Sequence, residues 1–204
     1  MMRRVIVYID GFNLYHAIDD LGQSHLKWLN LRALAESLLR TGEQVKLVRY
    51  FSAFATWKPD AYARHRDYVA ALKAHGIETN MASFKKKSRG CFNCGAKWLA
   101  HEEKETDVNI AVQMVADALT GEADRFILIS ADTDLAPPIR TIAQLAPQCE
   151  VFVATPPKRF NNCKALKPAL ELTPGRLAKC LLPEQVQISA TRTVLRPQSY
   201  APPP

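Results

Sequence analysis

Short, continuous apolar runs recur along the first three quarters of the chain, and they limit the possible folds more than any other feature. The runs cover residues 5–9, 45–51, 77–84, 126–129 and 151–154. They are rich in β-branched and aromatic side chains, which is typical of strands buried on both faces of a sheet. The chain therefore has several strands of the kind found inside parallel sheets.

The segments between these runs carry helix signals. Helices are predicted over residues 31–39, over 60–75, and from 107 to near 121. Asn30 and Thr106 can cap two of them, and Gly42 and Gly76 follow the ends of two. This alternation of strands and helices predicts an α/β domain with a mostly parallel central sheet.

The charge is distributed unevenly. The 204 residues include 27 basic and 20 acidic ones, for a net charge of +7, which favours an anionic partner. Residues 1–154 hold 19 basic and 18 acidic groups, whereas residues 155–204 hold 8 and 2. We predict one domain over residues 1–182, with a Lys- and Cys-rich insertion at 85–105, and a polar, Pro-rich, flexible tail over 183–204.

Apolar runs and cysteine usage bear on the compartment. No uncharged apolar run approaches the roughly 18 residues of a membrane span. The five cysteines are an odd number, which favours a reducing compartment over a disulfide framework. We expect a cytoplasmic protein that does not act in a membrane. The oligomeric state stays open, and a homodimer is compatible with the sequence.

Acidic residues follow two of the predicted strands. Asp10 comes directly after the first run, and Asp132 and Asp134 follow the run at 126–129. Asp107 lies in the first turn of a predicted helix. Ligands of open parallel sheets bind beyond the carboxyl ends of the strands, so these carboxylates can converge at one edge. Close carboxylates repel one another, and a divalent cation such as Mg²⁺ or Mn²⁺ removes that cost.

Each of these residues also has a simpler interpretation. An Asp after a strand often caps the next helix, and Asp107 could merely favour a helix dipole. A phosphatase of the haloacid-dehalogenase type also begins with a strand that ends in Asp. That chemistry needs a second Asp two places later as proton donor, where this chain has Phe12. The joint pattern of carboxylates therefore favours a metal site.

Three segments resemble the signature segments of NYN-domain proteins, which belong to the PIN-like nuclease superfamily. They are YIDGFNLY at residues 8–15, KETDV at 104–108 and ISADTDL at 129–135. The resemblance is closest to the bacterial LabA-like branch and covers residues 3–155, with an extension to 182. Ala131 stands where glycine is commoner, and this exchange of one small residue for another should not disable the site.

This resemblance implies a Rossmann-like, PIN-type three-layer fold, a divalent-metal site and ribonuclease activity. The metal ligands that it implies are Asp10, Asp107, Asp132 and Asp134, with Asn13 and Ser130 as polar support. We therefore expect a metal-dependent ribonuclease that uses Mg²⁺ or Mn²⁺ and acts on RNA, single-stranded by preference. The alternative is a non-catalytic RNA- or protein-binding regulatory module that retains the fold.

The predicted insertion holds two further candidate features. Cys91 and Cys94 form one CxxC pair, which is half of a structural zinc site because such a site takes four ligands. His101 and a remote Cys163 or an acidic group would have to complete it; reduced thiols or a small redox pair are the alternatives. The basic run at residues 85–89 either contacts an RNA backbone or is a solvated face.

Four aromatic residues are candidates for base stacking, although such residues also serve as core or loop anchors. They are Tyr15, Trp57, Phe92 and Trp98.

Overall fold

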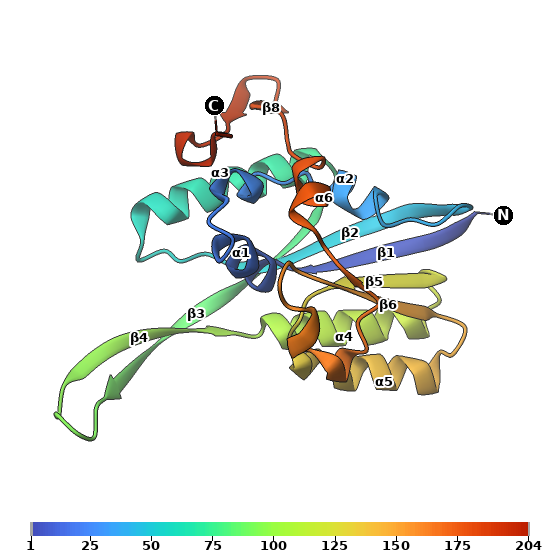
Figure 1. Ribbon diagram of the computed structural model, residues 1–204, viewed down its shortest axis with the longest axis horizontal. Coiled ribbons are helices and arrows are strands. Elements are labelled where there is room, and N and C mark those ends of the chain that lie inside the picture. Colours follow the sequence, from blue (N-terminus) through green and yellow to red (C-terminus); the bar gives the residue numbers. More distant parts are fainter. Residues whose placement is uncertain (1, 204) are drawn as a thin grey trace.

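The computed structural model describes residues 2–203 and shows one seven-stranded sheet with helices on both faces (Figure 1). The strands are β1 (Arg3–Asp10), β2 (Glu43–Ala53), β3 (Glu78–Gly90), β4 (Lys97–Lys104), β5 (Arg125–Ile129), β6 (Glu150–Thr155) and β7 (Leu170–Glu171). Their order across the sheet is β4-β3-β2-β1-β5-β6-β7. All neighbours are parallel except β3 and β4. The predicted α/β class with a mostly parallel sheet is confirmed.

Helices cover the sheet in two layers. The helices are α1 (Gly11–Asp19), α2 (Leu31–Glu36), α3 (Pro59–Ala74), α4 (Thr106–Leu119), α5 (Ala136–Leu145) and α6 (Pro174–Ala178). Figure 1 shows α1, α2, α3 and α6 on one face of the sheet and α4 and α5 on the other. The chain therefore has three layers, as a PIN-type fold requires.

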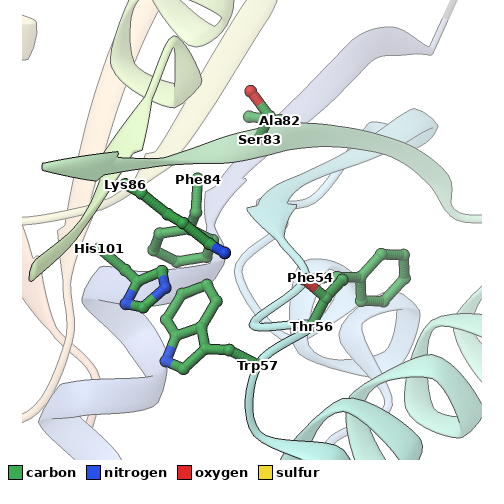
Figure 2. A pocket seen from close by; sticks show the side chains of 8 residues that line it. All are labelled: Phe54, Thr56, Trp57, Ala82, Ser83, Phe84, Lys86 and His101. Carbon is green, nitrogen blue, oxygen red and sulfur yellow. The ribbon is translucent and has the colours of Figure 1, made fainter. Parts of the chain in front are cut away.

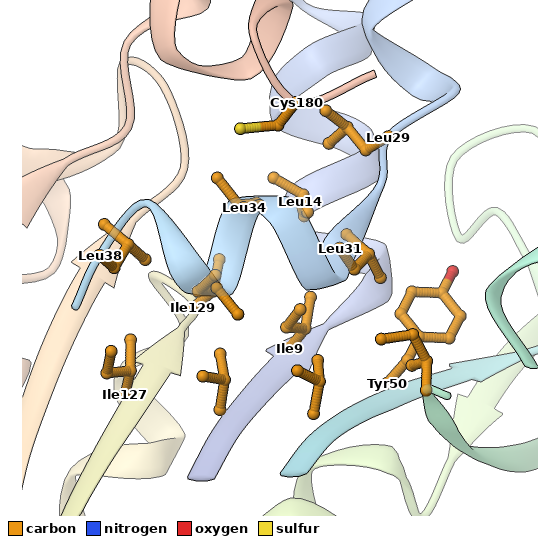
Figure 3. Close-up of a cluster of buried hydrophobic side chains, with 14 of the residues drawn as sticks. Ile9, Leu14, Leu29, Leu31, Leu34, Leu38, Tyr50, Ile127, Ile129 and Cys180 are labelled. Atoms are coloured by element: carbon orange, nitrogen blue, oxygen red, sulfur yellow. The ribbon is translucent and has the colours of Figure 1, made fainter. Parts of the chain in front are cut away.

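Strand β1 shows how the sequence builds two cores. Successive side chains of a strand point to opposite faces. Val7 and Ile9 lie in the cluster with α1 and α2, which Figure 3 shows above the strands, whereas Ile6 and Tyr8 lie in the cluster with α4 and α5. All these side chains are buried, so the continuous apolar run is explained by helices on both sides.

Of the two predicted helix caps, one forms and one does not. Asn30 caps α2 as predicted, because its side chain accepts a hydrogen bond from the backbone N–H of Ala33 at 3.0 Å. Thr106 does not cap α4 but is its first residue, and Glu105 precedes it with φ at 80°. The Thr106 hydroxyl instead donates to the Glu103 carboxylate.

The predicted insertion at 85–105 is a two-stranded ribbon. Strand β3 continues past the predicted end at residue 84 to Gly90, and β4 returns antiparallel to it. Figure 1 shows that this β3–β4 ribbon reaches well beyond the edge of the sheet. Phe84 lies opposite Glu103, and Lys86 lies opposite His101. Residues directly opposite in an antiparallel pair share a face, so these four side chains lie on one face of the ribbon.

A polar, flexible tail was expected over residues 183–204, and the structure shows a hairpin within that segment. Strands β8 (Gln185–Ser189) and β9 (Arg192–Leu195) pair antiparallel. Val186 and Val194 are buried in one cluster with Trp28. The Trp28 Nε1–H donates to the backbone oxygen of Pro183 at 2.8 Å. These strands are short and hold only four apolar residues, Val186, Ile188, Val194 and Leu195, so the polar composition concealed them.

One buried ion pair lies at the amino ends of the strands, opposite the predicted site. Arg125 donates from Nη1 to Glu43 Oε2 at 2.7 Å, and both side chains are 1% exposed. The Arg125 guanidinium also lies 4.5 Å from the ring centroid of Phe152. Among the described residues, none of the helices is long and apolar enough to span a membrane.

Candidate functional site

The acidic residues gather where the sheet topology changes direction. From β1 the chain proceeds outward through β2 and β3, and after β4 it crosses by way of α4 to β5, on the other side of β1. The crevice beyond β1 and β5 is thus the topological switch point, where open α/β sheets bind their ligands. Asp10 is the last residue of β1, and Asp132 follows the end of β5.

Three carboxylates meet at this point. Asp10, Asp107 and Asp132 each offer a carboxylate oxygen, and the three oxygens lie within 4.8 Å of one another. They come from β1, from the first turn of α4 and from the loop after β5. Asp10 is buried at 4% exposure, whereas Asp107 is exposed. Asp134 is exposed and outside this group of three.

Gly11 allows the chain to turn directly after Asp10. A Cβ added at Gly11 would lie 2.6 Å from Cε2 of Tyr50 and 2.7 Å from the backbone oxygen of Phe51. No side chain fits in that space, so only glycine lets α1 start so close to β2. The Asp10 side chain then caps α1 by accepting from the Asn13 N–H at 3.0 Å.

A hydrogen-bond network joins the loops after β1 and β5. The Ser130 hydroxyl donates to Asp10 Oδ2 at 2.9 Å and accepts from the Asp132 N–H at 3.0 Å. Asn13 Oδ1 accepts from the Ala131 N–H at 2.9 Å. Asn13 and Ser130 therefore position the carboxylates, and the Asn13 Oδ1 and Ser130 Oγ atoms are both used in hydrogen bonds within the protein.

The same aspartates can both cap a helix or turn and contribute to a metal site. Asp10 caps α1, and Asp132 accepts from the Asp134 N–H at 2.9 Å at the start of the next turn. Asp10 accepts the capping hydrogen bond at Oδ1 and the Ser130 hydroxyl at Oδ2, whereas Asp132 accepts its hydrogen bond at Oδ1. A carboxylate oxygen has more than one lone pair, so these hydrogen bonds orient the carboxylates and still leave positions for a cation.

Burial and mutual repulsion shape the electrostatics of the site. Burial, followed by the charges of Asp107 and Asp132, raises the pKa of Asp10 to about 6, although hydrogen bonds from Asn13 and Ser130 oppose the shift. The pKa of Asp107 is also raised, by partial burial and then by the charges of Asp132 and Asp134. Asp134 thus acts on the group through its charge.

Glu103 is a site residue that the sequence reasoning missed. Burial and the charges of Asp10 and Asp107 raise its pKa to about 7. It lies in β4 among several charged neighbours, and only its pairing with Phe84 indicates that it faces the carboxylates rather than solvent. The acidic stretch was visible in the sequence, but the strand register that selects Glu103 was not.

An aromatic hollow of about 510 Å³ lies between the loop after β2 and the β3–β4 ribbon (Figure 2). It is lined by Phe54, Thr56, Trp57, Ala82, Ser83, Phe84, Lys86 and His101. Trp57 stacks on His101, with ring centroids 3.7 Å apart, and meets the Phe84 ring edge-on at 4.6 Å. Phe84 also contacts Phe12 of α1, so the hollow adjoins the acidic site.

The basic run at residues 85–89 divides between the two faces of the ribbon. Lys87 and Arg89 form ion pairs with Glu102, which lowers the pKa of that carboxyl to about 2, together with Lys104. Lys86 lines the hollow, and in Figure 2 its side chain extends across it. Lys86 is therefore the basic side chain best placed to meet a phosphate near the site.

The zinc ligands proposed around the CxxC pair are not brought together within one chain. Cys91 and Cys94 lie between β3 and β4 at the tip of the ribbon, whereas His101 stacks on Trp57 near the domain. Cys163 is buried in the core beside α5. The structure thus leaves Cys91 and Cys94 as a two-ligand pair.

The raised pKa of Asp10 predicts an unusual pH dependence of stability. Between about pH 4 and 6, the folded chain keeps a proton that the unfolded chain has lost, so the free energy of unfolding falls as the pH rises. Asp10→Asn removes the buried charge and keeps an equally good helix cap. In metal-free buffer, we expect this variant to melt several degrees above the wild type at pH 8, with a much smaller difference at pH 5. Melting temperatures at the two pH values check this; an equal difference at both would contradict it.

Comparisons with known proteins bear on the fold and the family of this chain. The sequence is 29% identical to 6-hydroxy-3-succinoylpyridine 3-monooxygenase HspA from Pseudomonas putida, in an alignment that covers 97% of this chain and 75% of that protein. The fold is similar to the crystal structure of a protein of unknown function from Vibrio parahaemolyticus, with a TM-score of 0.60 and 17% identity. That match covers 89% of this chain and 97% of the other.

The family comparison covers most of the chain, including all the segments that supply the carboxylates. The model of the NYN domain family matches residues 4–169. The family assignment made from the three sequence segments is thereby confirmed. This chain belongs to the NYN domain family.

Proposed function

We propose that this protein is a metal-dependent ribonuclease that hydrolyses phosphodiester bonds of single-stranded RNA. The observation that carries the proposal is the convergence of Asp10, Asp107 and Asp132 from three separate segments at the switch point of the sheet. Clustered negative charge weakens the binding of an RNA backbone, so a pure RNA-binding module gains nothing from it. A hydrolase can use it to hold a divalent cation.

The residues present fit Mg²⁺ or Mn²⁺. All three ligand groups are carboxylates, and hard oxygen ligands suit these ions. Within residues 2–203, no basic side chain forms an ion pair with Asp10, Asp107 or Asp132, so no positive charge of these residues offsets the repulsion of the three carboxylates. Asp134 adds a nearby charge. A cation held by these residues would lower the pKa of a bound water and neutralise charge on the phosphate.

Residues around the carboxylates would then accept a proton from the attacking water and keep the carboxylates in position. Water attacks phosphorus as the bond to the 3′ oxygen breaks, which yields a 5′ phosphate and a 3′ hydroxyl after the leaving oxygen takes a proton from solvent. Glu103 is suited to accept the proton of the attacking water at Oε2, because its pKa is about 7 and its Oε1 already accepts from Thr106. Ser130 and Asn13 keep the carboxylates in place.

The aromatic hollow supplies a place for a base next to the scissile phosphate. Bases of single strands stack on aromatic side chains without regard to sequence, and the hollow offers Trp57 and Phe84 beside Lys86. Its volume of about 510 Å³ is in the range of roughly 300–1,000 Å³ that is usual for ligand sites. Stacking on aromatic side chains needs an unpaired base, which favours a single-stranded substrate.

Removal of the Trp57 ring is expected to weaken RNA binding. A stacked base contributes about 1–3 kcal/mol, so Trp57→Ala should raise the Kd for single-stranded RNA roughly 5- to 150-fold. Fluorescence anisotropy in the Asp132→Asn background measures binding without cleavage. Trp98→Ala is the matched control, because Trp98 lies opposite Arg89 near the ribbon tip and outside the hollow. Equal affinity of the two variants would show that RNA does not use the hollow.

Monooxygenation is a second candidate, because the relative from Pseudomonas putida carries that name. Oxygen insertion requires a redox-active metal or an organic cofactor together with an electron donor. Non-heme iron oxygenases typically use two histidines and one carboxylate, whereas the cluster here consists of carboxylates alone. The ligand set therefore favours hydrolysis.

One parallel experiment tests the proposal against both alternatives. The full chain, purified free of contaminating nuclease, is given labelled single-stranded RNA with Mn²⁺, and separately 6-hydroxy-3-succinoylpyridine with NADH under oxygen monitoring. We expect Mn²⁺-dependent RNA cleavage that EDTA stops. Oxygen consumption without RNA cleavage would assign the chain to the oxygenase class, and RNA binding without either reaction would make it a binding module.

A further inference from the structure

The tip of the β3–β4 ribbon is a tight turn built around the CxxC pair. The Cys91 N–H donates to the backbone oxygen of Ala96 at 2.8 Å, and the Gly95 N–H donates to that of Cys91 at 2.9 Å. Gly95 has φ at 69°, a left-handed conformation that glycine adopts without strain. The turn therefore places Cys91 and Cys94 in a fixed relation at the end of a projecting ribbon (Figure 1).

The two thiols are accessible, and the pKa of Cys91 is lowered. Both are free cysteines; Cys94 is exposed and Cys91 is partly exposed. The backbone N–H groups of Cys94 and Asn93, followed by the Cys94 thiol, lower the pKa of Cys91. A thiolate is the form of cysteine that binds a metal ion. The turn thus has the chemistry of half a zinc site.

The described residues of the same chain do not supply the other half. The only group of three or more metal-ligating side chains among residues 2–203 is the aspartate cluster. His101 lies four strand pairs from the last pair of the ribbon, which is about 13 Å along the strand. Cys163 is buried and donates from its thiol to the backbone oxygen of Arg159. Two ligands are therefore missing at the tip.

We propose that two copies of this chain meet tip to tip and share one zinc ion, which is bound by Cys91 and Cys94 of each copy. A structural zinc ion takes four ligands in a tetrahedron, and a two-fold axis through the ion supplies them from identical turns. Four thiols lose four protons to the buffer as the ion binds. The ribonuclease proposal is not needed for this inference.

The charges and shape of the ribbon favour a second copy as the partner. A zinc ion with four thiolates carries a net charge of −2, and Lys97 lies in the last pair of each ribbon, where it offsets part of that charge, whereas Arg89 is paired with Glu102. Without the ion, the two Lys97 side chains repel one another. Phe92, between the cysteines, is fully exposed in one chain. Because the ribbon projects from the domain, two tips can meet without collision of the domains, and the association should depend on zinc alone.

The test is a zinc titration of the full, reduced and metal-free chain, with mass measured by light scattering during gel filtration. We expect the mass to rise from the 22.8 kDa of one chain to twice that value, with saturation at half a zinc ion per chain, and to return on addition of EDTA. Cys91→Ser and Cys94→Ser should stay monomeric. Asp132→Asn should dimerise like the wild type, which separates this site from the aspartates.

Cobalt reports the ligand set directly. Co²⁺ added to the wild type should give the intense absorption bands of a tetrahedral tetrathiolate site, and Cys94→Ser should lack them. Unchanged melting temperatures of the Ser variants establish that only the tip has changed. Saturation at one zinc ion per chain with unchanged mass would overturn the proposal. A dimer that persists in Cys94→Ser would also overturn it. The same holds if the two thiols form a disulfide in air and the reduced chain does not change its mass when zinc is added.

Discussion

Asp132→Asn is expected to lower Mn²⁺-dependent cleavage of single-stranded RNA by at least about 100-fold, since loss of a group that merely supports a metal ligand already costs about 10- to 100-fold. Asp132 supplies one of the three carboxylate oxygens that lie within 4.8 Å of one another. Asn keeps the size of the side chain and can still accept a hydrogen bond from the Asp134 N–H. The fold should therefore persist while the negative charge is lost. Initial cleavage rates at saturating Mn²⁺ measure the effect.

Two further Asp→Asn variants make this test specific. Asp60 is exposed at the start of α3 and outside the group of three carboxylates, so Asp60→Asn should cleave RNA like the wild type. Asp134 lies outside the group of three but raises the pKa of Asp107, so Asp134→Asn should lose less activity than Asp132→Asn. Equal cleavage by wild type and Asp132→Asn would contradict the assignment of the aspartate cluster as the active site.

The largest effect on stability is expected at the other end of the sheet. Arg125→Met removes the nearest charged partner of Glu43, because the two side chains are each 1% exposed and 2.7 Å apart; the buried carboxylate then keeps only the Arg40 N–H and the more distant, exposed Arg3. Unpairing a buried carboxylate typically costs about 3 kcal/mol or more. In a domain of this size that loss lowers the melting temperature by roughly 6–12 °C. Thermal unfolding at pH 7 measures it.

A double variant shows whether the pair itself or the buried charge matters. Replacing both members of a buried ion pair by apolar residues is often nearly neutral. We therefore expect Arg125→Met with Glu43→Met to regain much of the stability that Arg125→Met loses. Arg140→Ala removes an exposed arginine from α5 and should change the melting temperature little. A double variant as unstable as the single one would show that shape, not charge, sets the cost.

The parts of the fold that local patterns determine were predictable from the sequence. Runs such as residues 5–9 are apolar because helices cover both faces of the sheet, and a strand of that kind needs no partner to be identified. The convergence of Asp10 and Asp132 follows from the rule on strand ends, since β1 and β5 are parallel neighbours. The family resemblance pointed to the same carboxylates.

Features that depend on pairing between distant segments were not predictable in the same way. Glu103 joins the site because β4 lies opposite β3 in one register, and a shift of one residue would turn Glu102 inward instead. The hairpin of β8 and β9 is stabilised because Val186 and Val194 pack in one cluster with Trp28, which lies more than 150 residues away in sequence. The local sequence around Glu103, Val186 and Val194 does not indicate which distant segment each of them contacts.

Direct measurement of Mn²⁺ binding tests most directly whether Asp10, Asp107 and Asp132 form one cation site. Isothermal titration of the metal-free chain at pH 8 with Mn²⁺ should show saturable binding for the wild type and for Asp60→Asn. Asp10→Asn, Asp107→Asn and Asp132→Asn should each bind Mn²⁺ at least about tenfold more weakly, because a metal ligand contributes no less than its supporting groups. Affinity unchanged in all three variants would contradict a cation site at the carboxyl ends of β1 and β5.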